Sequence, residues 1–161
     1  MRAMNDNGRI LCKIQGKLFA NYSSFSKCSP YVFIRRFMHS DLAKRFDDTT
    51  ILLEASNNNT FVNEIIEQYG ETNYGDPDSV DKEVLYWLGY VYRYWAFVYE
   101  VPSFILIQHV KPKSLVDRYP LYHSMDMEYL IERISEEEQV MIAPKKSLEE
   151  LLSEYLENHS N

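Results

Sequence analysis

Apolar residues recur every three or four positions along most of the chain, which is the spacing of one face of a helix. Ser29 and Pro30 predict a helix start, because Ser can cap free backbone N–H groups and Pro fits the first turn. The apolar stripe then continues to Phe46, with a predicted break and a second Ser cap at residues 39–41. Further helices are predicted over 10–25, 60–70, 103–110, 124–134 and 147–157. The pattern therefore predicts an all-α fold.

The most apolar segment is a predicted helix at residues 81–100. Eight of the fourteen residues from Tyr86 to Tyr99 are aromatic. Because aromatic side chains carry the most apolar surface, this helix is expected to be central and enclosed by its neighbours. One narrow stripe lacks aromatic residues and consists of Lys82, Gly89, Arg93, Ala96 and Glu100. The stripe either faces water or allows a second backbone to approach at its small residues.

Three segments depart from the helical pattern. Residues 50–55 fit a short strand and a helical turn equally well, so a strand there is left open. Residues 71–80 are rich in Gly, Asp, Asn and Pro, which predicts a loop. Residues 112–119 predict only a short turn, because Pro120 is expected to end it.

The length of 161 residues suits one domain with a sizeable core. Residues 9–157 are predicted to form this single helical domain, with disordered polar ends at 1–8 and 158–161. The two cysteines are too few for a disulfide scaffold, and the aromatic segment is shorter than the roughly 20 apolar residues of a membrane span. Lysines also interrupt the only early apolar stretch, so no signal peptide is predicted. The expected location is the cytoplasm, without a membrane partner.

The net charge of −7 is unevenly distributed along the chain. Residues 1–46 carry +7, whereas residues 47–161 carry −14. The two halves can attract each other within the fold or face different partners. The acidic majority argues against DNA binding, because phosphate contacts need clustered positive charge. The small basic cluster of Arg35, Arg36 and His39 is therefore better explained as a solvated helix face than as a nucleic-acid contact.

The chain shows no spacing typical of a metal, nucleotide or nucleophile site, so no cofactor is predicted and a non-enzyme is favoured over an enzyme. The one catalytic alternative is Arg118 and His123, which match the R-x4-H spacing of a family of helical ribonucleases. In such a site Arg would stabilise the phosphate and His would transfer a proton. Pro120 lies between the two residues and argues against a shared helix.

Arg93 lies among tyrosines and tryptophans, and two interpretations of it stay open. It can belong to an interface, since Tyr, Trp and Arg dominate binding hot spots. It can equally be an internal arginine paired with Glu100 or another acid. A third hypothesis is a pocket in which the tyrosines bind a small ligand. The helix at 147–157 either closes the core or docks onto a partner.

Four phrases of the chain resemble a group of short proteins from Gram-positive bacteria. They are PYVFIRRFMHSDLAKRFDD (30–48), EQYG (67–70), EVLYWLGYVYRYWAFVYE (83–100) and YPLYHSMDMEYLIERI (119–134). Members of that group are found beside genes that look like toxin–antitoxin components, often with small ADP-ribosyltransferase-like proteins. The resemblance implies an antitoxin-like or accessory protein that neutralises or accompanies a toxin-like enzyme from the same operon. Residues 101–115 depart from the pattern, since relatives tend to be more polar there.

Protein binding is therefore the predicted role, and association with further copies of the chain is left open. The resemblance supplies no catalytic residues. The binding residues it suggests lie within the matching phrases and are Arg35, Arg36, Tyr86, Tyr90, Arg93, Tyr94, Tyr122, His123 and Asp126.

Overall fold

The computed structural model describes residues 1–139 and 148–159, and within these ranges the fold is all-α, as predicted. The described helices are α1 (Asp6–Asn21), α2 (Pro30–His39), α3 (Asp41–Asp47), α4 (Asn58–Tyr69), α5 (Lys82–Tyr99), α6 (Ser103–His109), α7 (Pro112–Tyr122), α8 (Met127–Glu137) and α9 (Leu148–His159). Two short 3-10 helices accompany them, η1 (Tyr22–Ser24) and η2 (Thr50–Leu53).

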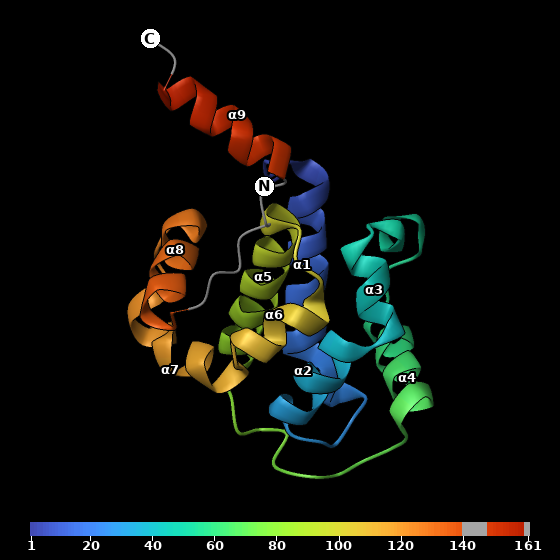
Figure 1. The fold of residues 1–161 in the computed structure, drawn as a ribbon. Helices are drawn as coiled ribbons and strands as arrows, with labels where there is room; N and C mark the ends of the chain where they lie inside the picture. Colours follow the sequence, from blue (N-terminus) through green and yellow to red (C-terminus); the bar gives the residue numbers. More distant parts are fainter. Residues whose placement is uncertain (140–147, 160–161) are drawn as a thin grey trace.

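Helices α1 and α5 form the central pair and run antiparallel, with α3 and α4 on one side and α7 and α8 on the other (Figure 1). The two backbones approach most closely at Gly89, where an added Cβ would lie 2.6 Å from the carbonyl oxygen of Gln15. The side-chain amide of Gln15 donates to the Gly89 carbonyl at 3.1 Å. The small stripe of α5 thus admits a second backbone, which confirms the second of the two predicted alternatives.

Aromatic side chains fill the core between α1, α2, α3 and α5. Phe37 makes edge-to-face contacts with Phe19 and Phe46, each with ring centroids 5.4 Å apart. The hydroxyl of the fully buried Tyr92 donates to the Val110 carbonyl at 2.7 Å and ties α5 to the end of α6. Most side chains of α5 are buried among its neighbours, and this explains why the helix carries so many aromatic residues.

The segment at 50–55 is not a strand, so the strand left open by the sequence is ruled out. It forms η2 instead, because Oδ1 of Asp48 accepts hydrogen bonds from the backbone N–H and the hydroxyl of Thr50. Thr49 adopts a left-handed conformation with φ 67°, which turns the chain so that Ile51 is buried. A strand here would have no neighbour to pair with among the described residues.

Helix α7 runs through Pro120 to Tyr122, so the prediction that Pro120 ends a short turn is wrong. Proline removes the hydrogen bond to the carbonyl four residues earlier, and its ring also crowds that carbonyl. Packing offsets that loss, since Tyr119 lies edge-on against Trp87 with ring centroids 5.5 Å apart. The backbone N–H of His123 also donates to the Tyr119 carbonyl at 3.0 Å and extends the hydrogen-bonded turn past the proline.

The two ends of the chain, 1–8 and 158–161, are the segments that were predicted to be disordered. Helix α1 begins at Asp6, capped by the Asn5 side chain, and Arg2 donates from its backbone N–H to the Val98 carbonyl at 2.7 Å. The Arg2 guanidinium also lies over the Phe97 ring, so residues 1–8 contact α5. At the other end α9 reaches His159, and residues 160 and 161 lie outside the described part.

Candidate functional site

Arg93 is an internal residue, 1% exposed, that joins four helices through its guanidinium. Its nitrogens donate to Gln15 Oε1 at 2.7 Å, to Asp47 Oδ1 at 2.6 Å and to Ser103 Oγ at 2.8 Å. The backbone N–H of Ser103 in turn donates to Asp47 Oδ2 at 3.0 Å, and its hydroxyl donates to Asp47 Oδ1 at 2.6 Å. We call these four residues the arginine hub.

The hub decides between the two interpretations of Arg93. Each of the three guanidinium nitrogens donates to a protein partner, and Arg93 is only 1% exposed, so its side chain cannot reach a partner at the surface. Its acid is Asp47 rather than Glu100, since Glu100 lies beyond the end of α5, where its carboxylate is 3.8 Å from the N-terminal ammonium of Met1. The arginine hub is therefore a structural element that holds α1, α3, α5 and α6 together.

Three tyrosines on α5 form a row at the surface, which we call the tyrosine row: Tyr86, Tyr90 and Tyr94. Their spacing of four residues places them on one side of the helix, with successive ring centroids 6.3 and 6.5 Å apart. All three side chains are half-buried, and their hydroxyls make no hydrogen bond to any described residue. Partial burial raises the pKa of each phenol above its usual value, so each keeps its proton at neutral pH.

The tyrosine row lies between α1 and the start of α8. At one end the Tyr86 ring covers Gly16 of α1, where an added Cβ would be 2.9 Å from the ring. At the other end the carboxylates of Glu128 and Asp126 add to the rise in the pKa of Tyr94. Arg9 of α1 acts in the opposite direction on the pKa of Tyr90, so charges of both signs border the row.

The predicted residues on α2 lie elsewhere and serve the fold. Arg36 donates to the Gly70 carbonyl at 2.6 Å, and its guanidinium lies 5.5 Å from the centre of the Tyr69 ring. These contacts fasten α2 to the end of α4. Arg35 is exposed, and its carbonyl is 2.8 Å from Nδ1 of His39.

The remaining predicted residues belong to the junction of α7 and α8. The Tyr122 hydroxyl donates to Glu137, and Asp126 caps α8 by accepting from the Glu128 backbone N–H at 3.1 Å. His123 is exposed, with its ring stacked on Tyr119 at 4.7 Å between centroids and its Nδ1 2.8 Å from the Tyr119 carbonyl.

Arg118 does not face an open phosphate site. Its Nε lies 3.0 Å from Glu137, and its Nη1 lies 2.8 Å from Glu138. Two carboxylates around one guanidinium neutralise the charge that a ribonuclease would direct at a phosphate. The geometry gives no support to catalysis by Arg118 and His123.

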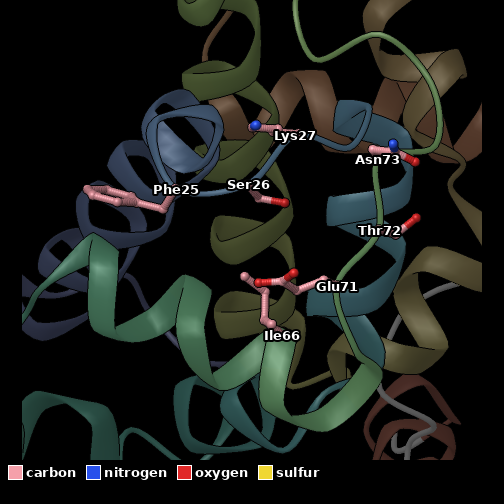
Figure 2. Close-up of a pocket in the computed structure, with 7 residues that line it drawn as sticks. All are labelled: Phe25, Ser26, Lys27, Ile66, Glu71, Thr72 and Asn73. Carbon is pink, nitrogen blue, oxygen red and sulfur yellow. The ribbon is translucent and has the colours of Figure 1, made fainter.

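A hollow of about 490 Å³ lies between the segment after η1 and the end of α4 (Figure 2). The Glu71 carboxylate lies beside the Ile66 side chain, with Ser26 on the opposite wall, whereas Phe25 and Asn73 lie at opposite sides of the view. None of the residues that line it is a tyrosine or belongs to α5. The hollow therefore differs from the tyrosine-lined ligand pocket that the sequence suggested.

The described residues contain no group of three or more His, Cys, Asp or Glu side chains placed to hold a metal ion. None of the described helices combines the length and apolar character needed to cross a membrane. Comparisons with protein-family models, with curated proteins and with solved structures found no match to this chain. The tyrosine row is thus the best-supported candidate site, and its support comes from geometry alone.

Sequence reasoning missed most of the polar partners at these sites. Gln15, Asp47 and Ser103 gave no local signal, because they reach Arg93 from 78, 46 and 10 residues away. The tyrosine row was detectable from its spacing, yet the same spacing is also typical of a buried helix face.

Proposed function

We propose that this protein binds another protein through the tyrosine row and acts as an antitoxin-like or accessory partner of a toxin-like enzyme in a bacterial cytoplasm. The observation that carries the binding role is the row itself: three adjacent, half-buried phenol rings whose hydroxyls have no partner among the described residues.

The physical character of the row suits a protein interface. Tyrosine offers a large rigid apolar surface together with one hydrogen-bonding group, and ordering it costs little entropy because it has two rotatable angles. The Tyr90 and Tyr94 rings stack on each other, and the Tyr86 ring lies against Gly16 of α1, so the rings are partly ordered before any partner arrives, which lowers the cost of binding. The charges beside the row have both signs, because Glu128 and Asp126 add to the rise in the pKa of Tyr94 while Arg9 opposes that of Tyr90, so a partner segment that carries both signs suits it best.

The proposed toxin-like partner rests on the resemblance of the four sequence phrases and not on the geometry. An ADP-ribosyltransferase-like enzyme encoded next to this protein is the partner class that the resemblance suggests. An antitoxin needs no catalytic residues, in keeping with the structural roles of Arg93 and Arg118.

Co-expression with the product of the neighbouring gene tests the proposal. We expect the two proteins to co-purify and the present protein to restore growth that the neighbour inhibits. A Tyr90→Ala/Tyr94→Ala variant should lose both effects while its circular dichroism spectrum stays that of the folded helical protein, with a melting temperature lowered by the loss of two half-buried rings.

The matched control is Tyr74→Ala, because Tyr74 is 76% exposed in the 70–81 loop and lies outside the row. It should bind and restore growth like the wild type. Absence of both co-purification and growth rescue with the wild type would rule out the toxin-like partner. Equal binding by the row variant and the control would remove the role of the tyrosine row.

A further inference from the structure

The hollow in Figure 2 has a wall of chain on each side, formed by residues 25–27 and 71–73. Tyr22 holds the first wall in place, because its carbonyl accepts from the Ser26 backbone N–H at 3.1 Å and its hydroxyl donates to the Cys28 carbonyl at 2.8 Å. Tyr22 is itself buried, so this wall is anchored in the core.

The second wall is held at both of its ends. Before it, the Arg36 side chain donates to the Gly70 carbonyl at 2.6 Å. After it, the Ser29 backbone N–H donates to the Tyr74 carbonyl at 2.9 Å, which joins the second wall to the chain that follows the first. The fold therefore builds the hollow before any ligand arrives, as is usual for small-molecule sites.

Two opposite charges line the hollow from its two walls. Lys27 belongs to the first wall and Glu71 to the second, and both are exposed. Neither side chain forms a hydrogen bond or an ion pair with the other, or with any other described residue. Both charges are therefore available to groups of opposite sign on a ligand.

The rest of the lining combines apolar and polar side chains. The Phe25 side chain is 40% exposed, and the half-buried Ile66 side chain lies beside the Glu71 carboxylate (Figure 2). Ser26 and Asn73 add a hydroxyl and an amide. A ligand that matches this lining needs one group of each charge, and an apolar portion attached close to its positive group.

We propose that the hollow binds a free α-amino acid with an apolar side chain. In that class of molecule one carbon carries an ammonium group, a carboxylate and the side chain, which match Glu71, Lys27 and the apolar lining. The four-carbon stem of lysine is flexible, so the Lys27 ammonium can reach the ligand carboxylate. The volume of about 490 Å³ lies within the range of roughly 300–1,000 Å³ for small-molecule sites.

This site is independent of the toxin-like partner proposed above, because it shares no residue with the tyrosine row. NMR titration of the full chain tests it, with L-phenylalanine and L-leucine as probes. We expect the amide signals of residues 25–27, 66 and 71–73 to shift with either amino acid, while the amide signals of the tyrosine row stay in place.

Analogues that lack one charge test the role of each charged residue. L-Phenylalaninamide has no carboxylate, and N-acetyl-L-phenylalanine has no ammonium group. Lys27→Gln should weaken the binding of phenylalanine about fivefold, the upper end for an exposed ion pair, and leave the binding of phenylalaninamide unchanged. Glu71→Gln should weaken the binding of phenylalanine by the same factor and leave the binding of the N-acetyl derivative unchanged.

The controls are Lys13→Gln and Glu132→Gln, which make the same changes at exposed positions outside the hollow. Both should bind phenylalanine like the wild type. Absence of shifts at the hollow with both amino acids would overturn the inference. Equal weakening of phenylalanine and of the matching analogue by a hollow variant, or unchanged binding of phenylalanine by both hollow variants, would overturn it as well.

Discussion

The guanidinium of Arg93 lies 2.6 Å from the carboxylate of Asp47, a residue 46 positions earlier in the chain. Arg93 is almost completely buried and Asp47 is 21% exposed, so the pair is shielded from water on one side only. Ser103 bonds to both residues and completes the arrangement. A buried pair of this kind contributes little net stability when intact, but removing one partner leaves polar groups without bonds in a dry environment.

Replacing Arg93 by Met should therefore lower the free energy of unfolding by about 3–5 kcal/mol, the range for removing one member of a buried ion pair. Urea denaturation followed by circular dichroism measures the change. Lys113→Met is the control, because it breaks the exposed Lys113–Asp117 pair on α7 and should leave the unfolding midpoint where it is. Equal midpoints for the two variants would contradict the role given to the arginine hub.

Gly89→Ala should destabilise the protein by about 1–3 kcal/mol, even though alanine favours a helix by about 1 kcal/mol over glycine. The new methyl group would press on the backbone of α1, at 2.6 Å from the Gln15 carbonyl oxygen, and a backbone cannot move aside cheaply. Gly16→Ala provides the comparison, because the three atoms nearest to its methyl group would all belong to the half-buried side-chain ring of Tyr86 and not to a backbone. Thermal denaturation should rank Gly16→Ala as the more stable variant, and the reverse order would show that α1 and α5 pack differently.

Stability should fall as the pH rises above about 9. Burial raises the pKa of the Cys12 thiol from 9.0 to about 12, and burial also raises the pKa of the Tyr92 phenol well above 10. Between pH 9 and 12 the unfolded chain releases these protons while the folded chain keeps them, so alkali favours unfolding. Each group contributes its full stabilising free energy when the pH is below the pKa that the group has in the unfolded chain. That contribution is lost as the pH rises toward the pKa that the group has in the folded chain.

Urea denaturation at a series of pH values measures this loss. Each group contributes a slope of at most about 1.4 kcal/mol per pH unit, the limit for one proton. Cys12→Ala and Tyr92→Phe should each flatten the decline above pH 9 relative to the wild type. A decline of the same steepness in both variants would mean that other groups cause it.

RNA should remain intact when it is incubated with this protein. The charge of Arg118 is neutralised by Glu137 and Glu138, so it is not available to a scissile phosphate. The test compares the wild type with His123→Ala on total RNA, and both should show only background cleavage. Cleavage by the wild type that disappears in the variant would restore the ribonuclease alternative.

Much of the fold could be predicted from the sequence, because single residues mark the helix starts and the close backbone contact. Ser29 and Ser40 cap α2 and α3 as expected, since a hydroxyl acts on N–H groups within three residues of itself. Gly89 likewise marked the place where a second backbone approaches α5, because only a residue without a side chain permits that distance.

The errors arose where distant packing outweighs local preference. Pro120 is an unfavourable helix residue, yet contacts of Tyr119 and Tyr122 with other parts of the chain hold α7 together around it. The 50–55 segment, for which a strand and a helical turn were both left open, has no strand beside it in the described residues and forms the helical turn. The partners of Arg93 and Arg118 come from other helices, and spacing along the sequence carries no information about them.

Because a single guanidinium connects Gln15, Asp47 and Ser103 to α5, none of the helices that carry these residues can detach without breaking a buried hydrogen bond. Hydrogen exchange of the amides in α1, α3, α5 and α6 should accordingly report one shared opening energy, as in a single cooperative folding unit. Helix α9 contributes nothing to that network, so its amides are expected to exchange early while the remainder of the molecule stays closed.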